Sequence, residues 1–304
     1  VGTKLLILNP SPIESIPSDR QVVERSLKPA SVFPVTQASA VELPFGNEQV
    51  FEYTNPELID KWKPKYLHAS KDGSVWVSEE NTLLRFSDGK LDVFTSAQGF
   101  PEVMASVGED QAGNIWIGGQ TVLARWNSHG MTTYGSEERM NSSRVFSIGE
   151  TPSGTMFFGK RDFYISYLEG NKFHDVHPAV SPTAGVLWTT RTTFRSRDGD
   201  WWLLTDEGVY RFAGVSDIKE LQGREPTKKY TQNDGLSGIA GFQIYEDKKG
   251  VIWLSARGTG PDRHGLSRWS KDKDRFEAFT EADGFPKGKS VSSFAGGGIG
   301  ENRI

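Results

Sequence analysis

Two short stretches of this 304-residue chain hold residue types that could carry out chemistry. His174 and His177 flank Asp175-Val176 and could supply two metal ligands. No helix and no further acidic ligands at useful spacing accompany them, so we interpret the segment as a solvated loop. The glycine-rich stretch 296–300 looks like a phosphate-binding loop, but the Lys-Ser/Thr that must follow is absent, and we expect a turn or a disordered end.

A third candidate is a set of Asp, Gly and aromatic residues that recurs along the chain. Five times a glycine is followed three residues later by a large aromatic residue, at intervals of 40 to 51 residues. Residues that return once per period belong to a structural repeat rather than to a catalytic set. The pairs are Gly73 and Trp76, Gly113 and Trp116, Gly154 and Phe157, Gly199 and Trp202, and Gly250 and Trp253.

Each copy predicts the same succession of elements. An Asp before the glycine favours a tight turn, since Asp bonds to nearby backbone and Gly supplies a positive φ. The alternation in residues 114–117 indicates a strand after the turn. Twelve residues after the glycine, an Arg and an aromatic residue mark another strand, as in Arg85-Phe86 and Arg125-Trp126. Four strands per copy follow, and radial packing of the copies buries both faces of each sheet.

The predicted fold class is all-β, a β-propeller of four-stranded antiparallel blades, with five recognisable blades, a partial one, and six, seven or more in the intact ring. The motif Trp is expected to fill the wedge between blades. Residues 1–45 show no repeat and predict an extended N-terminal arm or linker before a propeller over 46–304. Phe51–Thr54 resembles the strand at 276–280 and is expected to close the ring by pairing with a C-terminal blade. The predicted blades span 64–101, 102–141, 142–182, 183–238, 239–290 and, in part, 291–304.

The pattern Glu-Asp-x-x-Gly-x-Ile-Trp-Ile-Gly, followed later by Tyr/Phe-Thr-x-x-Asp-Gly-Leu/Phe-Pro, resembles the two-component regulator propeller repeat. The best matches are 109–118, 246–254 and 279–286, and the resemblance covers about residues 64–294 with a degenerate third copy. It implies the exported sensor region of a bacterial histidine kinase or hybrid regulator, in the periplasm or outside the cell. Residues 70–76 also resemble the Asp-box of sialidase-like propellers, a local likeness only.

Composition excludes several classes of function. The net charge is −4 with both signs well mixed, so no basic stripe indicates a nucleic-acid partner. The chain has no cysteine, which excludes disulfides and thiolate metal sites. No run of 18 apolar residues predicts direct membrane insertion. The chain begins at Val1, and we expect a processed or trimmed product. We predict no cofactor and no metal.

Candidate ligand-binding residues fall in loops of one predicted face. With blade strands lettered A to D in chain order, the D–A and B–C loops share a face of a propeller. Arginine suits carboxylate, sulfate or phosphate, and Trp suits a sugar face. The B–C loop of the fifth copy also carries a six-residue insertion. The candidates are Arg144, Arg161, Trp188, Arg191, Arg257, Arg263 and His264.

These observations favour a non-catalytic sensor module over an enzyme. It would bind an extracellular small molecule or oligosaccharide, such as an anionic glycan fragment, or a partner protein, and relay that state to a kinase or regulator. The alternatives are a glycan-active lyase or hydrolase and a protein–protein scaffold. A hydrolase needs two carboxylates that flank a bond. The repeat already uses the carboxylates we could nominate, so no catalytic residue is predicted.

Overall fold

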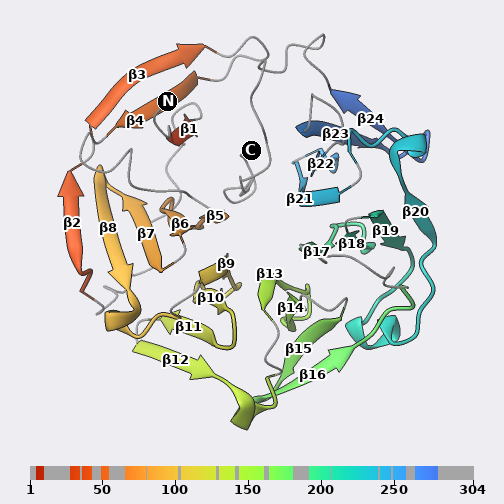
Figure 1. Cartoon of the computed structure of the whole chain (residues 1–304), viewed down its shortest axis with the longest axis horizontal. Coiled ribbons are helices and arrows are strands. Elements are labelled where there is room, and N and C mark those ends of the chain that lie inside the picture. The colour runs from red at the N-terminus through yellow and green to blue at the C-terminus, as the bar shows by residue number, and fades with distance from the viewer. Residues whose placement is uncertain are drawn as a thin grey trace.

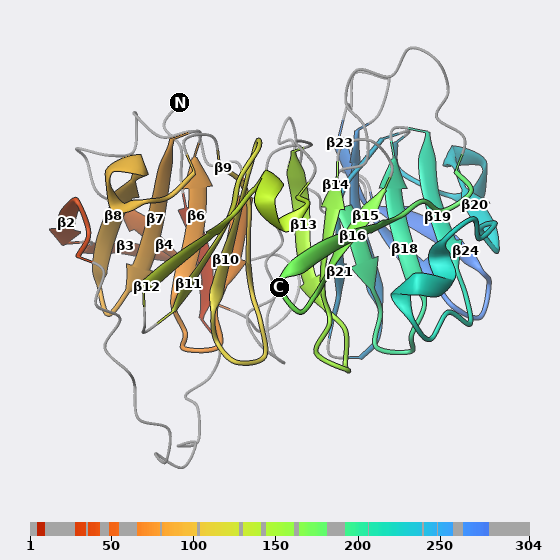
Figure 2. The same cartoon turned by 90° about the horizontal axis from the view of Figure 1, so that it is seen from below.

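The chain forms a ring of β-sheets in a computed structural model (Figure 1). Figure 2, turned by 90°, shows the strands of the sheets running along the ring axis. No helix of the described residues is long and apolar enough to cross a membrane. The structure describes residues 5–9, 28–34, 36–42, 49–54, 66–79, 81–101, 104–127, 130–140, 144–160, 164–180, 192–205, 207–238, 240–247, 249–257 and 264–279.

Five sheets contain four consecutive antiparallel strands, A to D, with A innermost and D outermost in the ring. This confirms the predicted fold class, and the described residues contain no α-helix. The strands are β5 (Tyr66–Ala69), β6 (Val75–Glu79), β7 (Thr82–Ser87) and β8 (Lys90–Thr95) in blade one; β9 (Met104–Glu109), β10 (Ile115–Gly119), β11 (Leu123–Asn127) and β12 (Gly130–Tyr134) in blade two; β13 (Val145–Glu150), β14 (Met156–Lys160), β15 (Ile165–Glu169) and β16 (Lys172–Val176) in blade three; β17 (Thr192–Arg195), β18 (Trp201–Thr205), β19 (Gly208–Phe212) and β20 (Lys228–Tyr230) in blade four; and β21 (Ala240–Glu246), β22 (Ile252–Arg257), β23 (His264–Ser270) and β24 (Arg275–Phe279) in blade five.

The recurring glycine ends the turn between strands A and B, as predicted. In blade two the Gly113 N–H donates to the Asp110 carbonyl at 3.0 Å, with Gly113 at φ +81°. The Asp110 N–H then donates to the Asn114 carbonyl at 3.1 Å and starts the ladder of strand B. Only glycine adopts this φ at low cost, which explains why it marks every period.

The aromatic residues of strand B pack between neighbouring blades. Apolar clusters join blades one and two, two and three, three and four, and four and five. Trp253 contacts Phe279 of its own blade. The ring contacts across seams are Trp76 with Trp126 at 5.1 Å, Trp116 with Phe158 at 5.5 Å, Phe157 with Trp201 at 4.8 Å and Trp202 with Trp269 at 5.0 Å.

The predicted pairing of Phe51–Thr54 with a C-terminal blade is wrong. These residues belong to β4 (Gln49–Thr54), the central strand of a three-stranded sheet between β1 (Leu5–Asn9) and β3 (Thr36–Glu42). Both edges of β4 are therefore taken by the N-terminal region. In Figure 1 this sheet stands in the ring between blade one and blade five.

The N-terminal region is also more than an arm or linker. Besides β1 and β3, it contains β2 (Ser31–Pro34), which pairs antiparallel with β8 and makes blade one five-stranded. Val32, at 52% exposure, faces outward from this added strand. The predicted boundary at residue 45 passes between β3 and β4, which are hydrogen-bonded partners.

Candidate ligand-binding face

Two cationic residues of blade three stand at strand ends on the face that carries the D–A and B–C loops. Strand A begins at this face and strand B ends at it. Arg144 immediately precedes β13, and Lys160 is the last residue of β14. Val145 and Lys160 are register partners, so the backbone brings Arg144 and Lys160 to one corner of the sheet.

Arg144 is the only predicted ligand residue whose side chain the structure describes. Its guanidinium carbon lies 5.6 Å from the centre of the Phe146 ring. Its Nε is buried and has no hydrogen-bond partner among the described residues. A guanidinium held on a ring presents its planar fork to carboxylate, sulfate or phosphate.

Lys160 was missed by the sequence analysis, although it is 0% exposed. Lysine is almost never fully buried in a protein, because burying an ammonium group is costly unless it is paired. Blades two and five carry Gly119 and Ala256 at the same place, which pair with Met104 of β9 and Gly241 of β21 as Lys160 pairs with Val145. Aligning strand ends between blades would have exposed this exception.

The other candidates are placed only in part. Arg257 ends β22 and His264 starts β23, and the two are register partners at the mouth of the blade-five B–C loop. Their side chains are not described. Arg161, Trp188, Arg191 and Arg263 lie outside the described residues, as does the glycine-rich stretch 296–300. Their part in a site stays a prediction.

The recurring aspartates serve the scaffold. Asp110 Oδ2 accepts the Trp116 Nε1–H at 2.8 Å. Asp247 Oδ2 accepts the Trp253 Nε1–H at 3.0 Å. Each carboxylate also accepts backbone N–H groups of its own turn, so it fixes the turn and the Trp together. These two carboxylates are therefore committed to structure.

The glutamates that end the A strands also serve the scaffold. The second residue of an A–B turn donates its backbone N–H to the glutamate of the next blade. Its side chain donates to the backbone carbonyl of the residue that follows this glutamate. We term this pair of contacts a clasp. The backbone donors and acceptors are Lys71 and Glu109 at 2.8 Å, Gln111 and Glu150, and Arg197 and Glu246 at 2.7 Å. The side-chain donors and carbonyls are Lys71 and Asp110, Gln111 and Thr151, and Arg197 and Asp247.

The clasp between blades one and two holds a buried charge. The Glu109 side chain is 4% exposed, and burial acts to raise its pKa. The opposing effects are His68, whose Nε2 lies 3.7 Å from Glu109 Oε2, and hydrogen bonds from the Lys71 N–H and the Ser70 hydroxyl. Together they outweigh burial and hold the pKa of Glu109 below its ordinary value.

The His174–His177 segment is not a loop, contrary to the sequence interpretation. His174 lies in β16, stacked on Tyr167 at 5.3 Å, and His177 contacts the Tyr164 ring at 5.3 Å. Asp175 accepts the Ser166 hydroxyl. Among the described residues, no group of three His, Asp or Glu side chains could hold a metal ion.

Comparisons with known proteins support the architecture. No family model matches the sequence, and no curated protein matches it. One similar structure is a catalytically inactive variant of virginiamycin B lyase from Staphylococcus aureus with quinupristin, with TM-score 0.56, 14% identity, and coverage of 78% of this chain and 76% of that chain. Another is YCF48 bound to D1 peptide, with TM-score 0.51, 12% identity, and coverage of 86% and 90%.

A third similar structure is the extracellular domain assigned to a hybrid two-component system from B. thetaiotaomicron. Its TM-score is 0.54 at 15% identity, over 82% of this chain. This chain spans 39% of the length of that chain. At such identities the likeness shows a shared fold alone, and it agrees at that level with the resemblance of the repeat. Enzymes and binding proteins both occur among these neighbours, so function has to be argued from the site.

Proposed function

We propose that this propeller is a non-catalytic recognition module in the exported sensor part of a bacterial signalling protein, where it binds an anionic ligand on the D–A and B–C face. The register pairing of Val145 with Lys160 carries the proposal, because it brings the backbone of Arg144 and of a buried lysine to one corner of the sheet. Arg161 follows Lys160 directly in the chain. Arg144 and Lys160 at one corner favour a ligand with carboxylate, sulfate or phosphate groups.

The commitment of the acidic residues supports recognition over glycoside hydrolysis. A hydrolase needs two carboxylates on either side of a glycosidic bond. Asp110 and Asp247 are held by Trp indoles, and Glu109 and Glu246 are held in clasps. The resemblance of the repeat to sensor propellers, and the shared fold with a two-component extracellular domain, support the signalling context and an extracytoplasmic location.

Calorimetric titration of carboxylated and sulfated oligosaccharides tests the proposal. Arg144→Ala and Lys160→Met should weaken binding roughly ten- to a hundredfold, as expected when one charged hydrogen bond is lost. Arg191→Ala and Arg263→Ala should weaken it similarly if those residues join the site. Arg224→Ala is the matched control, because this exposed arginine lies in the C–D loop of blade four.

Two results would contradict the proposal. An anionic oligosaccharide that binds with unchanged affinity to Arg144→Ala and Lys160→Met must sit elsewhere. Mass spectrometry of the bound oligosaccharide after long incubation addresses catalysis. Shortened or unsaturated products would identify a hydrolase or a lyase instead of a recognition module.

A further inference from the structure

The seam between blades three and four breaks the clasp pattern on both sides. The residue in the donating position is Pro152, which has no N–H. The residue in the accepting position, at the end of β17, is Arg195 rather than glutamate. Thr151 stands where blade one has Ser70, whose hydroxyl reaches Glu109. The Thr151 hydroxyl instead bonds within its own turn, to the Ser153 hydroxyl and the Thr155 N–H. Donor and acceptor are therefore lost together.

Arg195 places a cation where blades two, three and five place an anion. Its Nη2 lies 3.4 Å from the point that a Cβ on Gly199 would occupy. In blades two, three and five, a glutamate oxygen occupies the corresponding position beside the turn glycine. These Oε1 distances are 3.6 Å for Glu109 at Gly113, 3.7 Å for Glu150 at Gly154 and 3.7 Å for Glu246 at Gly250.

The Arg195 guanidinium has an unmet demand for an acceptor. Its carbon lies 5.9 Å from the centre of the Trp201 ring. Its Nε is buried and has no hydrogen-bond partner among the described residues. A buried donor without an acceptor costs free energy, and an incoming carboxylate would remove that cost.

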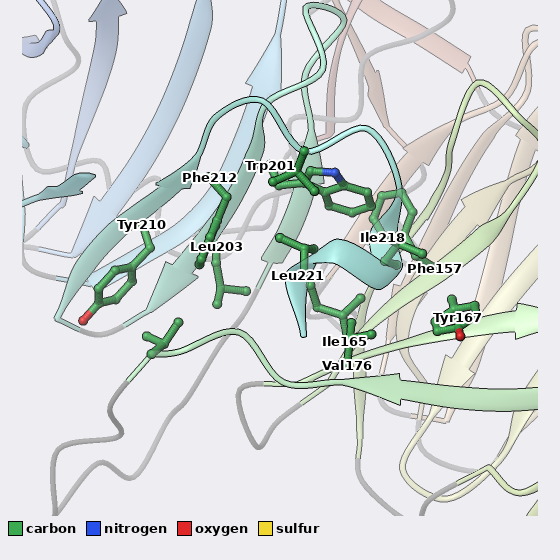
Figure 3. Close-up of a cluster of buried hydrophobic side chains, with 12 residues drawn as sticks. Phe157, Ile165, Tyr167, Val176, Trp201, Leu203, Tyr210, Phe212, Ile218 and Leu221 are labelled. Atoms are coloured by element: carbon green, nitrogen blue, oxygen red, sulfur yellow. The ribbon is translucent and has the colours of Figure 1, made fainter. Parts of the chain in front are cut away.

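Blades three and four are held together by other contacts. The C–D loop of blade four, residues 213–227, which we term the strap, crosses to blade three. Ile218 and Leu221 of the strap point into a cluster with Trp201 and Ile165, as Figure 3 shows. The Gly223 N–H donates to the His177 carbonyl at 2.8 Å, and Lys219 pairs with Glu169 at 2.8 Å. The strap thus holds this seam without a clasp.

We propose that Arg195 is a receptor for a carboxylate supplied from outside the chain, which takes the place of the missing clasp glutamate. The A–B turns and the strap lie on the face opposite to the D–A and B–C loops, so this site is separate from the proposed anionic-ligand corner. The two sites can therefore fail or succeed independently. A planar carboxylate matches the fork of a guanidinium that is already held on Trp201.

Nitrogen-15 NMR of the arginine Nε–Hε groups tests the proposal directly. The Arg195 signal is assigned from its loss in Arg195→Gln. Titration with glutarate, and separately with a blocked Gly-Glu-Gly peptide, should shift this signal saturably, and a blocked Gly-Gln-Gly peptide should not. A response to the peptide but not to glutarate would identify a protein partner as the source, and a response to glutarate alone a small molecule.

Two variants and one control decide the outcome. Arg195→Gln should weaken binding at least about tenfold, read from the backbone amides of residues 153–155. Arg197→Gln, two residues away and paired with Glu246, should change it less than about twofold. Pro152→Lys with Arg195→Glu rebuilds the clasp, which should abolish binding and raise the thermal midpoint. The proposal is overturned if neither probe shifts Arg195 up to about 100 mM, where a millimolar site is saturated, or if Arg195→Gln binds as wild type does.

Discussion

Replacing Glu109 by Gln removes the negative charge of one clasp and keeps the size and shape of the side chain. The Oε2 atom of Glu109 accepts the Ser70 hydroxyl and the Lys71 N–H, both at 2.8 Å. Glutamine has nearly the same volume and keeps one carbonyl oxygen that can accept both donors. The substitution therefore turns two charge-assisted hydrogen bonds into neutral ones and removes no packing.

The expected loss follows from that count. A hydrogen bond to a charged group contributes about 1.5–3 kcal/mol and a neutral one about 0.5–1.5 kcal/mol, a difference of about 1 kcal/mol per bond. For the two bonds of Glu109, the free energy of unfolding should fall by about 2 kcal/mol at pH 7. At about 2–4 °C per kcal/mol for a domain of this class, the midpoint should fall by roughly 4–8 °C.

The loss should depend on pH with a definite sign. The pKa of Glu109 is lower in the folded protein than its ordinary value of 4.5. The stabilisation is then fully present above the unfolded pKa and disappears as the pH falls through the folded pKa. The difference between wild type and Glu109→Gln should thus persist from pH 7 to about pH 5 and should shrink below that.

Denaturant and thermal unfolding of both proteins, followed by Trp fluorescence across this pH range, measure the difference. Glu150→Gln is the matched control in the next clasp, because Glu150 accepts the Gln111 N–H but has Asp110, a carboxylate with no hydrogen to donate, in the place of Ser70, and it should lose about half as much. A Glu109→Gln protein as stable as wild type at pH 7, or a difference that persists unchanged at acid pH, would refute the clasp as an electrostatic contact.

Four further substitutions test the scaffold by thermal unfolding. Gly235→Ala should destabilise the protein by more than about 3 kcal/mol, because the added Cβ would lie far inside contact distance of a backbone oxygen. Gly223→Ala is the comparison: Gly223 also has a positive φ but lies in open space, so the substitution should cost only about 1 kcal/mol. Equal losses for the two variants would contradict this reasoning. Asp110→Asn should cost about 1–3 kcal/mol, because the Trp116 indole loses a charged acceptor; a neutral effect would show the bond to be dispensable. Leu221→Ala should cost about 2–5 kcal/mol, since this strap residue is 0% exposed; a loss under about 1 kcal/mol would mean that the strap does not hold the seam.

The blades could be predicted from the sequence because each copy solves the same physical problem with the same residues. The turn needs a positive φ at its end, which Gly113 supplies, and the seam needs a large flat side chain, which Trp76 supplies. Those demands return at every period and leave a visible trace. Blade three keeps the fold with Thr151 and Phe157 because a hydroxyl can also accept a turn N–H and any large aromatic can fill a seam.

The strand pairing in the N-terminal region has no comparable signal in the sequence. A sheet ladder is built from backbone N–H and C=O groups that every residue but proline carries, so an extended segment can pair with many edges. The likeness of Phe51–Thr54 to the strand at 276–280 therefore predicted that the segment is a strand, but it did not predict which strand it pairs with. The pairing of β2 with β8 was unpredictable for the same reason.

The clasp, once known from the structure, makes the sequence informative about the ring. Blade five carries Lys248 in the donating position. Blade one carries Ala69 where blade two has Glu109, and alanine has no side-chain acceptor. Blade five therefore cannot clasp blade one as blade one clasps blade two. A ring with these blades as direct neighbours would leave that clasp open, as it is between blades three and four, and in the structure the sheet of β1, β4 and β3 stands between them.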